Sequence, residues 1–100
     1  MPAGIGSIHT SQVLTADGVV GTSGEDTIVF AATIKGGSAV TTAVLHEGTG
    51  TGGTKHEDAI APVNNSVTVF YGDNGVHYPG GCYLNITTTG GSVTVVYNQD

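Results

Sequence analysis

Residues 65–97 read NSVTVFYGDNGVHYPGGCYLNITTTGGSVTVVY, and this third of the chain decides the fold class. Three runs within it, residues 66–71, 82–87 and 92–97, alternate along the chain and are rich in β-branched and aromatic residues, as half-buried strands are. Glycine-rich segments separate the runs, and such a link between two alternating runs is typical of a hairpin. The sequence therefore predicts β-strands here, with the last two runs paired antiparallel.

The same alternation assigns a core-facing side to each strand. Cys82 shares an apolar face with Leu84 and Ile86, so we expect this lone cysteine to be a small buried hydrophobe. The shared face of the last run carries Val93, Val95 and Tyr97. A further strand is predicted over residues 27–35, and its core set is expected to be Ile28, Phe30, Ala32 and Ile34.

Residues 39–47 are predicted to form a strand whose two faces are both moderately apolar. Such a strand is either covered on both sides within its own chain or in contact with another subunit. For a subunit interface, the candidates on this strand and on the last strand are Val40, Ala43, Leu45 and Tyr97.

About seven or eight short strands are expected in all, with turn signals every ~8–12 residues, which is the pattern of a β-sandwich or jelly roll. We therefore predict an all-β fold, with a single-domain antiparallel sandwich over residues 9–100 after a flexible N-terminal arm over residues 1–8. A chain of 100 residues buries only roughly 60–65% of its unfolded surface. The core is thin, so a partner subunit is expected to supply part of the stability.

The charge balance argues against several partner classes. Two basic residues stand against eight acidic ones, which gives a formal net charge of −6 at pH 7. Such a surface repels phosphate backbones and anionic lipids, so neither nucleic acid nor a membrane is an expected partner. The sequence shows neither a membrane-spanning run nor a secretory signal, which predicts a soluble protein made in a cytoplasm.

Catalytic patterns are missing from the sequence. No nucleophile-elbow motif is present, and the glycine-rich segment 48–53 lacks the lysine that ends a phosphate-binding loop. The paired carboxylates, Glu25-Asp26 and Glu57-Asp58, are adjacent, so on an extended chain they point in opposite directions. We expect no enzyme activity, no catalytic residue and no cofactor.

Ion binding is an open alternative at the glycine-rich segment. His46 and Glu47 precede it, and His56, Glu57 and Asp58 follow it, so a hairpin there would bring these groups together. Their spacing matches no metal-ligand motif, which favours a solvated rim, and no metal site is predicted. A symmetric oligomer could also bring copies of His9 or His77 together.

Sugar binding is a second alternative, because four tyrosines could form an aromatic platform. These are Tyr71, Tyr78, Tyr83 and Tyr97. Tyr97 shares a face with Val93 and Val95, so core or interface packing is the favoured role for at least some of them.

The order of the elements resembles that of small virion proteins of tailed bacteriophages, which are head decoration (cement) proteins or β-domains of fibres and tail appendages. The resemblance spans roughly residues 27–97 and is carried by residues 27–37, 42–48, 66–70, 74–78, 81–87 and 92–97. It implies a trimeric β-sandwich or jelly roll that lies on a larger assembly.

The resulting hypothesis is a non-enzymatic virion structural protein, a homotrimeric capsid decoration protein that bridges subunits of the phage major capsid protein. It would be made in the host cytoplasm and lie on the capsid surface, with capsid contacts from Pro2, Ile5 and Ile8 of the arm. The alternative is a receptor- or glycan-binding β-domain of a tail fibre or appendage. A free-standing bacterial sugar-binding module is disfavoured, because such modules are usually exported.

Overall fold

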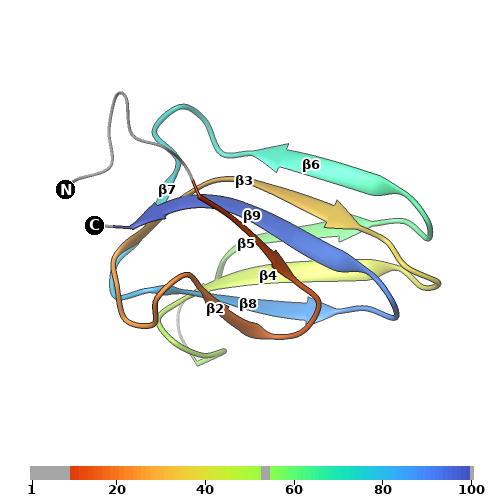
Figure 1. Ribbon diagram of the computed structural model, residues 1–100, viewed down its shortest axis with the longest axis horizontal. Helices are drawn as coiled ribbons and strands as arrows, with labels where there is room; N and C mark the ends of the chain where they lie inside the picture. Colours follow the sequence, from red (N-terminus) through yellow and green to blue (C-terminus); the bar gives the residue numbers. More distant parts are fainter. Residues whose placement is uncertain (1–9, 53–54, 100) are drawn as a thin grey trace.

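The computed structural model describes residues 10–52 and 55–99, which form nine β-strands and no helix (Figure 1). Accordingly, these residues contain no helix long and apolar enough to cross a membrane. The strands are β1 (Thr10–Leu14), β2 (Gly18–Val20), β3 (Thr27–Lys35), β4 (Thr41–Glu47), β5 (Lys55–Ala61), β6 (Ser66–Phe70), β7 (Val76–Tyr78), β8 (Cys82–Thr87) and β9 (Ser92–Gln99).

The strands form two antiparallel sheets that pack face to face as a β-sandwich, which confirms the predicted fold class (Figure 1). The five-stranded sheet has the order β1-β9-β3-β6, and β7 pairs with β3 beside β6. The four-stranded sheet has the order β2-β8-β4-β5. β8 and β9 therefore lie in the middle of a sheet, next to two neighbours each.

The core lies between the sheets and is built from the inward-facing residues of both. Its buried members are Leu14, Val20, Val29, Ala32, Ile34, Ala43, Leu45, Ala61, Tyr78, Cys82, Leu84, Val93, Val95 and Tyr97. The predicted inward faces of the last two strands are confirmed, since Val93 and Val95 are fully buried and Ile86 packs against the core. Most core members are small or medium-sized, as expected for a thin core.

The predicted hairpin between the last two strands is wrong. β8 pairs with β2 and β4, whereas β9 pairs with β1 and β3, so the glycine-rich link between them crosses from one sheet to the other. The inner faces of β8 and β9 are both apolar, and they bury this surface by packing face to face across the core. A glycine-rich link permits such an arch as readily as a hairpin.

The predicted core face of β3 is correct at one end and wrong at the other. Ala32 and Ile34 are buried, but Val29 is buried in place of Ile28 and Phe30, which are only half-buried. The cause is a β-bulge: Val29 pairs with Tyr97 and Ala31 with Val96, so Phe30 is an extra residue in the register with β9. An extra residue inverts the alternation beyond it.

Gly36 and Gly37 fix the junction between β3 and β4 by close backbone approach. A Cβ atom on Gly36 would lie 1.9 Å from the Pro62 carbonyl oxygen, and one on Gly37 would lie 2.0 Å from that of Thr89. The Gly36 N–H donates to the Asn65 carbonyl oxygen at 2.7 Å. Only glycine permits three chain segments to meet this closely.

Two strands, β1 and β5, lie at the margins of the sheets. The first strand lies at the margin of the five-stranded sheet, where β1 pairs with β9 alone. β5 lies at the margin of the four-stranded sheet and ends at Ala61, directly before Pro62. Proline has no N–H to donate to a ladder, which is why it follows an edge strand here.

Candidate interaction surface

A shallow apolar groove lies on the outer face of the five-stranded sheet. We call it the Phe70 groove; it has a volume of about 490 Å³ and is lined by Phe30, Ala31, Phe70, Gly72, Asp73 and Val96. Phe70 is 79% exposed, which is unusual for an aromatic residue within a strand. Asp73 adds a carboxylate to the lining.

Strand register positions the groove. Ala31 of β3 pairs with Phe70 of β6 on one side and with Val96 of β9 on the other, so these three side chains form a row across the sheet. The bulge places Phe30 next to this row, although the simple alternation predicts it inside the core. Next to β6, the chain turns through residues 72–75, where the Gly75 N–H donates to the Gly72 carbonyl oxygen at 3.2 Å.

The same face becomes polar away from the groove. The next row contains Thr68, Thr33 and Thr94, and the Thr33 and Thr68 hydroxyl oxygens are hydrogen-bonded at 3.0 Å. The row beyond it contains Ser66, Lys35 and Ser92. Across β6, β3 and β9, the outer face therefore has an apolar end at Phe70 and a hydroxyl-rich remainder, and on β1 the exposed Val13 continues the row of Thr94.

The predicted subunit-interface residues separate in the structure. Ala43, Leu45 and Tyr97 lie in the core of the chain itself, at 4%, 3% and 9% exposure, so most of their surface is already covered. Val40 lies just before β4 and is 48% exposed. Of the four, Val40 has the most surface to offer another subunit, and their role in an interface stays a prediction. The predicted capsid contacts Pro2, Ile5 and Ile8 lie outside the described residues.

The four tyrosines do not form one platform. Tyr78 and Tyr97 belong to the core, and half-buried Tyr71 packs against it. Tyr83 lies on the opposite, four-stranded sheet, where it pairs with His46 of β4 and Val19 of β2. The exposed aromatic ring on the sandwich is that of Phe70, a residue the sequence reasoning did not single out. A signal for it exists, because Phe70 alternates with Val67 and Val69 and shares its face with Ser66 and Thr68.

The predicted ion-binding groups are only partly described. β4 and β5 do pair as a hairpin around the glycine-rich segment, with His46 opposite Lys55. The side chains of residues 55–58, which include His56, Glu57 and Asp58, lie outside the described part of the structure. Among the described residues, no group of three His, Cys, Asp or Glu side chains could hold a metal ion.

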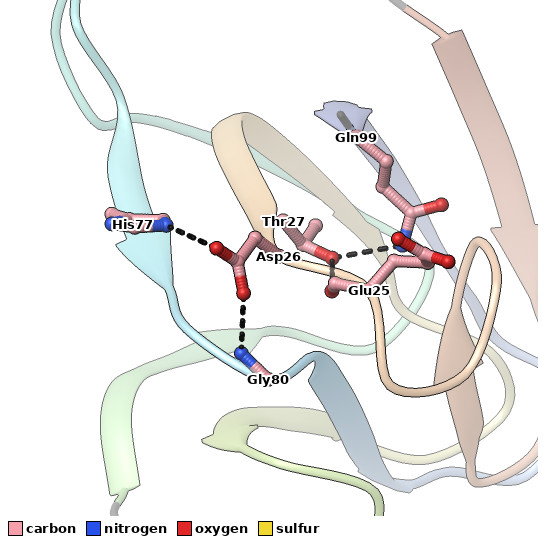
Figure 2. Close-up of polar contacts among 6 residues, drawn as sticks. All are labelled: Glu25, Asp26, Thr27, His77, Gly80 and Gln99. Atoms are coloured by element: carbon pink, nitrogen blue, oxygen red, sulfur yellow. Dashed lines mark hydrogen bonds and ion pairs between the residues drawn. The ribbon is translucent and has the colours of Figure 1, made fainter. Parts of the chain in front are cut away.

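Asp26 and His77 form an exposed polar contact at the end of β7 (Figure 2). The Asp26 Oδ2 atom lies 3.8 Å from His77 Nε2, and Asp26 Oδ1 accepts a hydrogen bond from the Gly80 N–H at 2.9 Å. Figure 2 shows that the carboxylate lies between the two groups. Both side chains are open to solvent, so the pair links the loop before β3 to the turn after β7 and adds little electrostatic energy.

Cys82 confirms its predicted role as a buried residue. It is fully buried on β8, and burial raises the pKa of its thiol to about 12. A thiol with this pKa stays protonated at neutral pH and is a poor nucleophile.

No protein-family model matches this chain, and no curated protein or solved structure matches it either.

Proposed function

We propose that this chain is a non-enzymatic structural protein of a phage virion, a homotrimeric decoration protein on the capsid surface. The observation that carries the proposal is the exposed Phe70 ring in an apolar groove on a small, rigid sandwich. An exposed apolar patch on a rigid scaffold is typical of a protein–protein contact. The resemblance of the sequence pattern over residues 27–97 to small virion proteins supports the choice of partner.

The proposed mechanism is mechanical. Each copy contacts neighbouring subunits of the major capsid protein, so the binding free energy of many copies adds to the stability of the shell and opposes outward pressure from packaged DNA. The N-terminal arm, with Ile5 and Ile8, and the Phe70 groove provide apolar contacts. The net charge of −6 favours solubility of the decorated particle.

The test is binding to shells assembled from the phage major capsid protein. The unaltered chain is expected to sediment with the shells and to raise their rupture temperature. The variants Ile5→Ser/Ile8→Ser and Phe70→Ser are expected to bind weakly, because each removes apolar contact area. Val13→Ser is the matched control, because Val13 is also exposed on this sheet but lies on β1, away from the groove. An unaltered chain that stays in the supernatant at saturating shell concentration would contradict the proposal.

A second candidate function is glycan recognition by a fibre or appendage domain. The observation that favours it is the pairing of aromatic and carboxylate groups in the Phe70 groove, since sugars stack on aromatic rings and donate hydroxyl hydrogens to carboxylates. Under this function, Phe70→Ser and Asp73→Asn both abolish binding to a glycan array or to host cells. Ile5→Ser/Ile8→Ser leaves that binding unchanged, which separates the two functions.

A further inference from the structure

The edge strands of the two sheets differ in how well they are protected against pairing with a strand of another molecule. β6 lies along the margin of the five-stranded sheet (Figure 1). Its sequence, SVTVF, contains neither a charged residue nor proline, and four of its five residues are β-branched or aromatic. Exposed edge strands of this composition pair readily with another strand, because charge and proline are the usual means of preventing it.

The other margins are less open. β5 carries lysine, glutamate and aspartate in its sequence, and β2 is only three residues long. At β1, the Gln12 side chain reaches across the sandwich margin, where its Oε1 accepts from the Gly21 N–H at 2.7 Å and its Nε2 donates to the Val19 carbonyl oxygen at 3.4 Å. β6 is therefore the margin best suited to a new strand.

The hydrogen bonds at the two ends of the β3–β6 ladder show which backbone groups of β6 are available. Gly36 N–H donates to the Asn65 carbonyl oxygen, and Tyr71 N–H donates to the Phe30 carbonyl oxygen at 2.9 Å. Hydrogen-bonded and non-hydrogen-bonded pairs alternate along an antiparallel ladder. It follows that Val67 and Val69 bond to β3, while the N–H and C=O groups of Ser66, Thr68 and Phe70 face away from it.

We propose that β6 pairs antiparallel with β6 of a second copy of this chain, around a two-fold axis at Thr68. In that register, the Thr68 N–H of each copy donates to the Thr68 carbonyl oxygen of the other. Ser66 of each copy exchanges two further hydrogen bonds with Phe70 of the other copy. Every outward-facing backbone group of β6 then has a partner, and two five-stranded sheets become one continuous sheet.

The side chains on the outer face fit this register. Phe70 comes to lie opposite Ser66 of the second copy, and Lys35 is the neighbour of Ser66 on β3. Since serine is small, the Lys35 side chain of the second copy can extend over it and place its methylenes and ammonium group on the Phe70 ring. The pairing thus covers the side of the 79% exposed Phe70 residue that faces away from β3, whereas Ala31 and Val96 of the Phe70 groove lie on its other side, toward β3. β6 contains no acidic residue, so the pairing of two β6 strands places no carboxylates next to each other.

A charge swap at Thr68 tests the pairing, because this residue faces its own copy at the axis. Sedimentation velocity over a rising concentration series should give the unaltered chain twice the mass of Thr68→Lys or Thr68→Glu. Each variant alone places like charges side by side at the axis and should not pair. An equimolar mixture of the two variants should regain the doubled mass, since opposite charges then meet. Thermal unfolding of each variant checks that the exposed Thr68 position tolerates the change.

Thr10→Lys and Thr10→Glu are the matched controls, because Thr10 is exposed on the opposite edge strand of the same sheet. They should leave the doubled mass unchanged. Three results would overturn the pairing: equal masses for the unaltered chain and both Thr68 variants at every concentration, a mixture that fails to double, or a loss of doubling in the Thr10 variants. The two-fold contact at β6 is separate from the three-fold interface of the proposed trimer, so the two together would give six chains. A mass of three chains that is insensitive to Thr68 would overturn the two-fold contact alone.

Discussion

Cys82 shows how burial alone sets the chemistry of a side chain. Burial raises the pKa of its thiol from 9.0 to about 12, so the folded protein holds the neutral form at physiological pH. We expect iodoacetamide at pH 8 to leave the native chain unmodified and to alkylate it once the chain is unfolded in urea. Mass spectrometry before and after denaturation measures this, and rapid alkylation of the native chain would contradict the buried position.

The same pKa difference predicts how stability depends on pH. Below pH 9 the thiol is protonated in both the folded and the unfolded chain, so its contribution is constant. Above that pH only the unfolded chain loses the proton, and the free energy of unfolding falls by about 1.4 kcal/mol per pH unit until the folded thiol also ionises. Urea unfolding of the unaltered chain and Cys82→Ala at two alkaline pH values isolates this term, because the variant lacks it.

Glycine is required at position 36 because there is no space for a Cβ atom, and not because of an unusual backbone conformation. In Gly36→Ala the new methyl group meets the Pro62 carbonyl oxygen, a backbone atom that cannot rotate away, so we expect a loss of several kcal/mol or failure to fold. Gly50→Ala is the control, since its Cβ meets nothing within 4 Å. Urea unfolding monitored by circular dichroism compares the two, and equal stabilities would contradict the close approach.

At the scale of elements, Gln99 of β9 anchors the loop between β2 and β3, and Figure 2 shows its contact with Thr27 at the start of β3. Its Oε1 accepts from the Thr22 N–H at 2.9 Å, and its Nε2 donates to the Thr22 carbonyl oxygen at 3.0 Å and to Thr27 Oγ1 at 2.9 Å. We expect Gln99→Ala to cost about 2 kcal/mol, because each such bond contributes about 1 kcal/mol and some groups regain water. Chemical denaturation provides the value.

The matched control for Gln99 is Asn65→Ala, which removes a single exposed side-chain bond to the Val63 carbonyl oxygen. Its loss should be well under half as large. Hydrogen exchange adds a local readout, since the amide of Thr22 should lose protection in Gln99→Ala and keep it in the control. Unchanged exchange at Thr22 would mean that the loop is held by other contacts.

Alternation predicted the elements of this fold well, because it depends on neighbours along the chain. The inward faces of β8 and β9 follow directly from their sequences. The pairing partner of each strand could not be predicted in this way, since a glycine-rich link between Thr87 and Ser92 suits an arch between sheets as well as a hairpin. The bulge at Phe30 could not be predicted from the sequence either, because it is defined only by the register with β9.

The candidate surface was harder to predict than the core for the same reason. Phe70 shares a face with Ser66 and Thr68, so its outward direction could be inferred from β6 alone. Its neighbours in the groove, Ala31 and Val96, come from strands distant in the sequence, and only the pairing places them together. Residues that alternate into the core, such as Leu45 and Tyr97, look equally suited to a subunit interface until the opposite sheet is known.

At the scale of the whole molecule, the position of β9 has a consequence for biosynthesis. Among the strands in residues 10–52 and 55–99, β9 is the last to be synthesised, yet it lies between β1 and β3 and is the only one of these strands to which β1 pairs. Until it leaves the ribosome, β1 has no neighbour and β3 has one open edge. The nascent chain therefore holds unpaired strands until β9 emerges, and the five-stranded sheet then closes through contacts between distant segments, which form slowly.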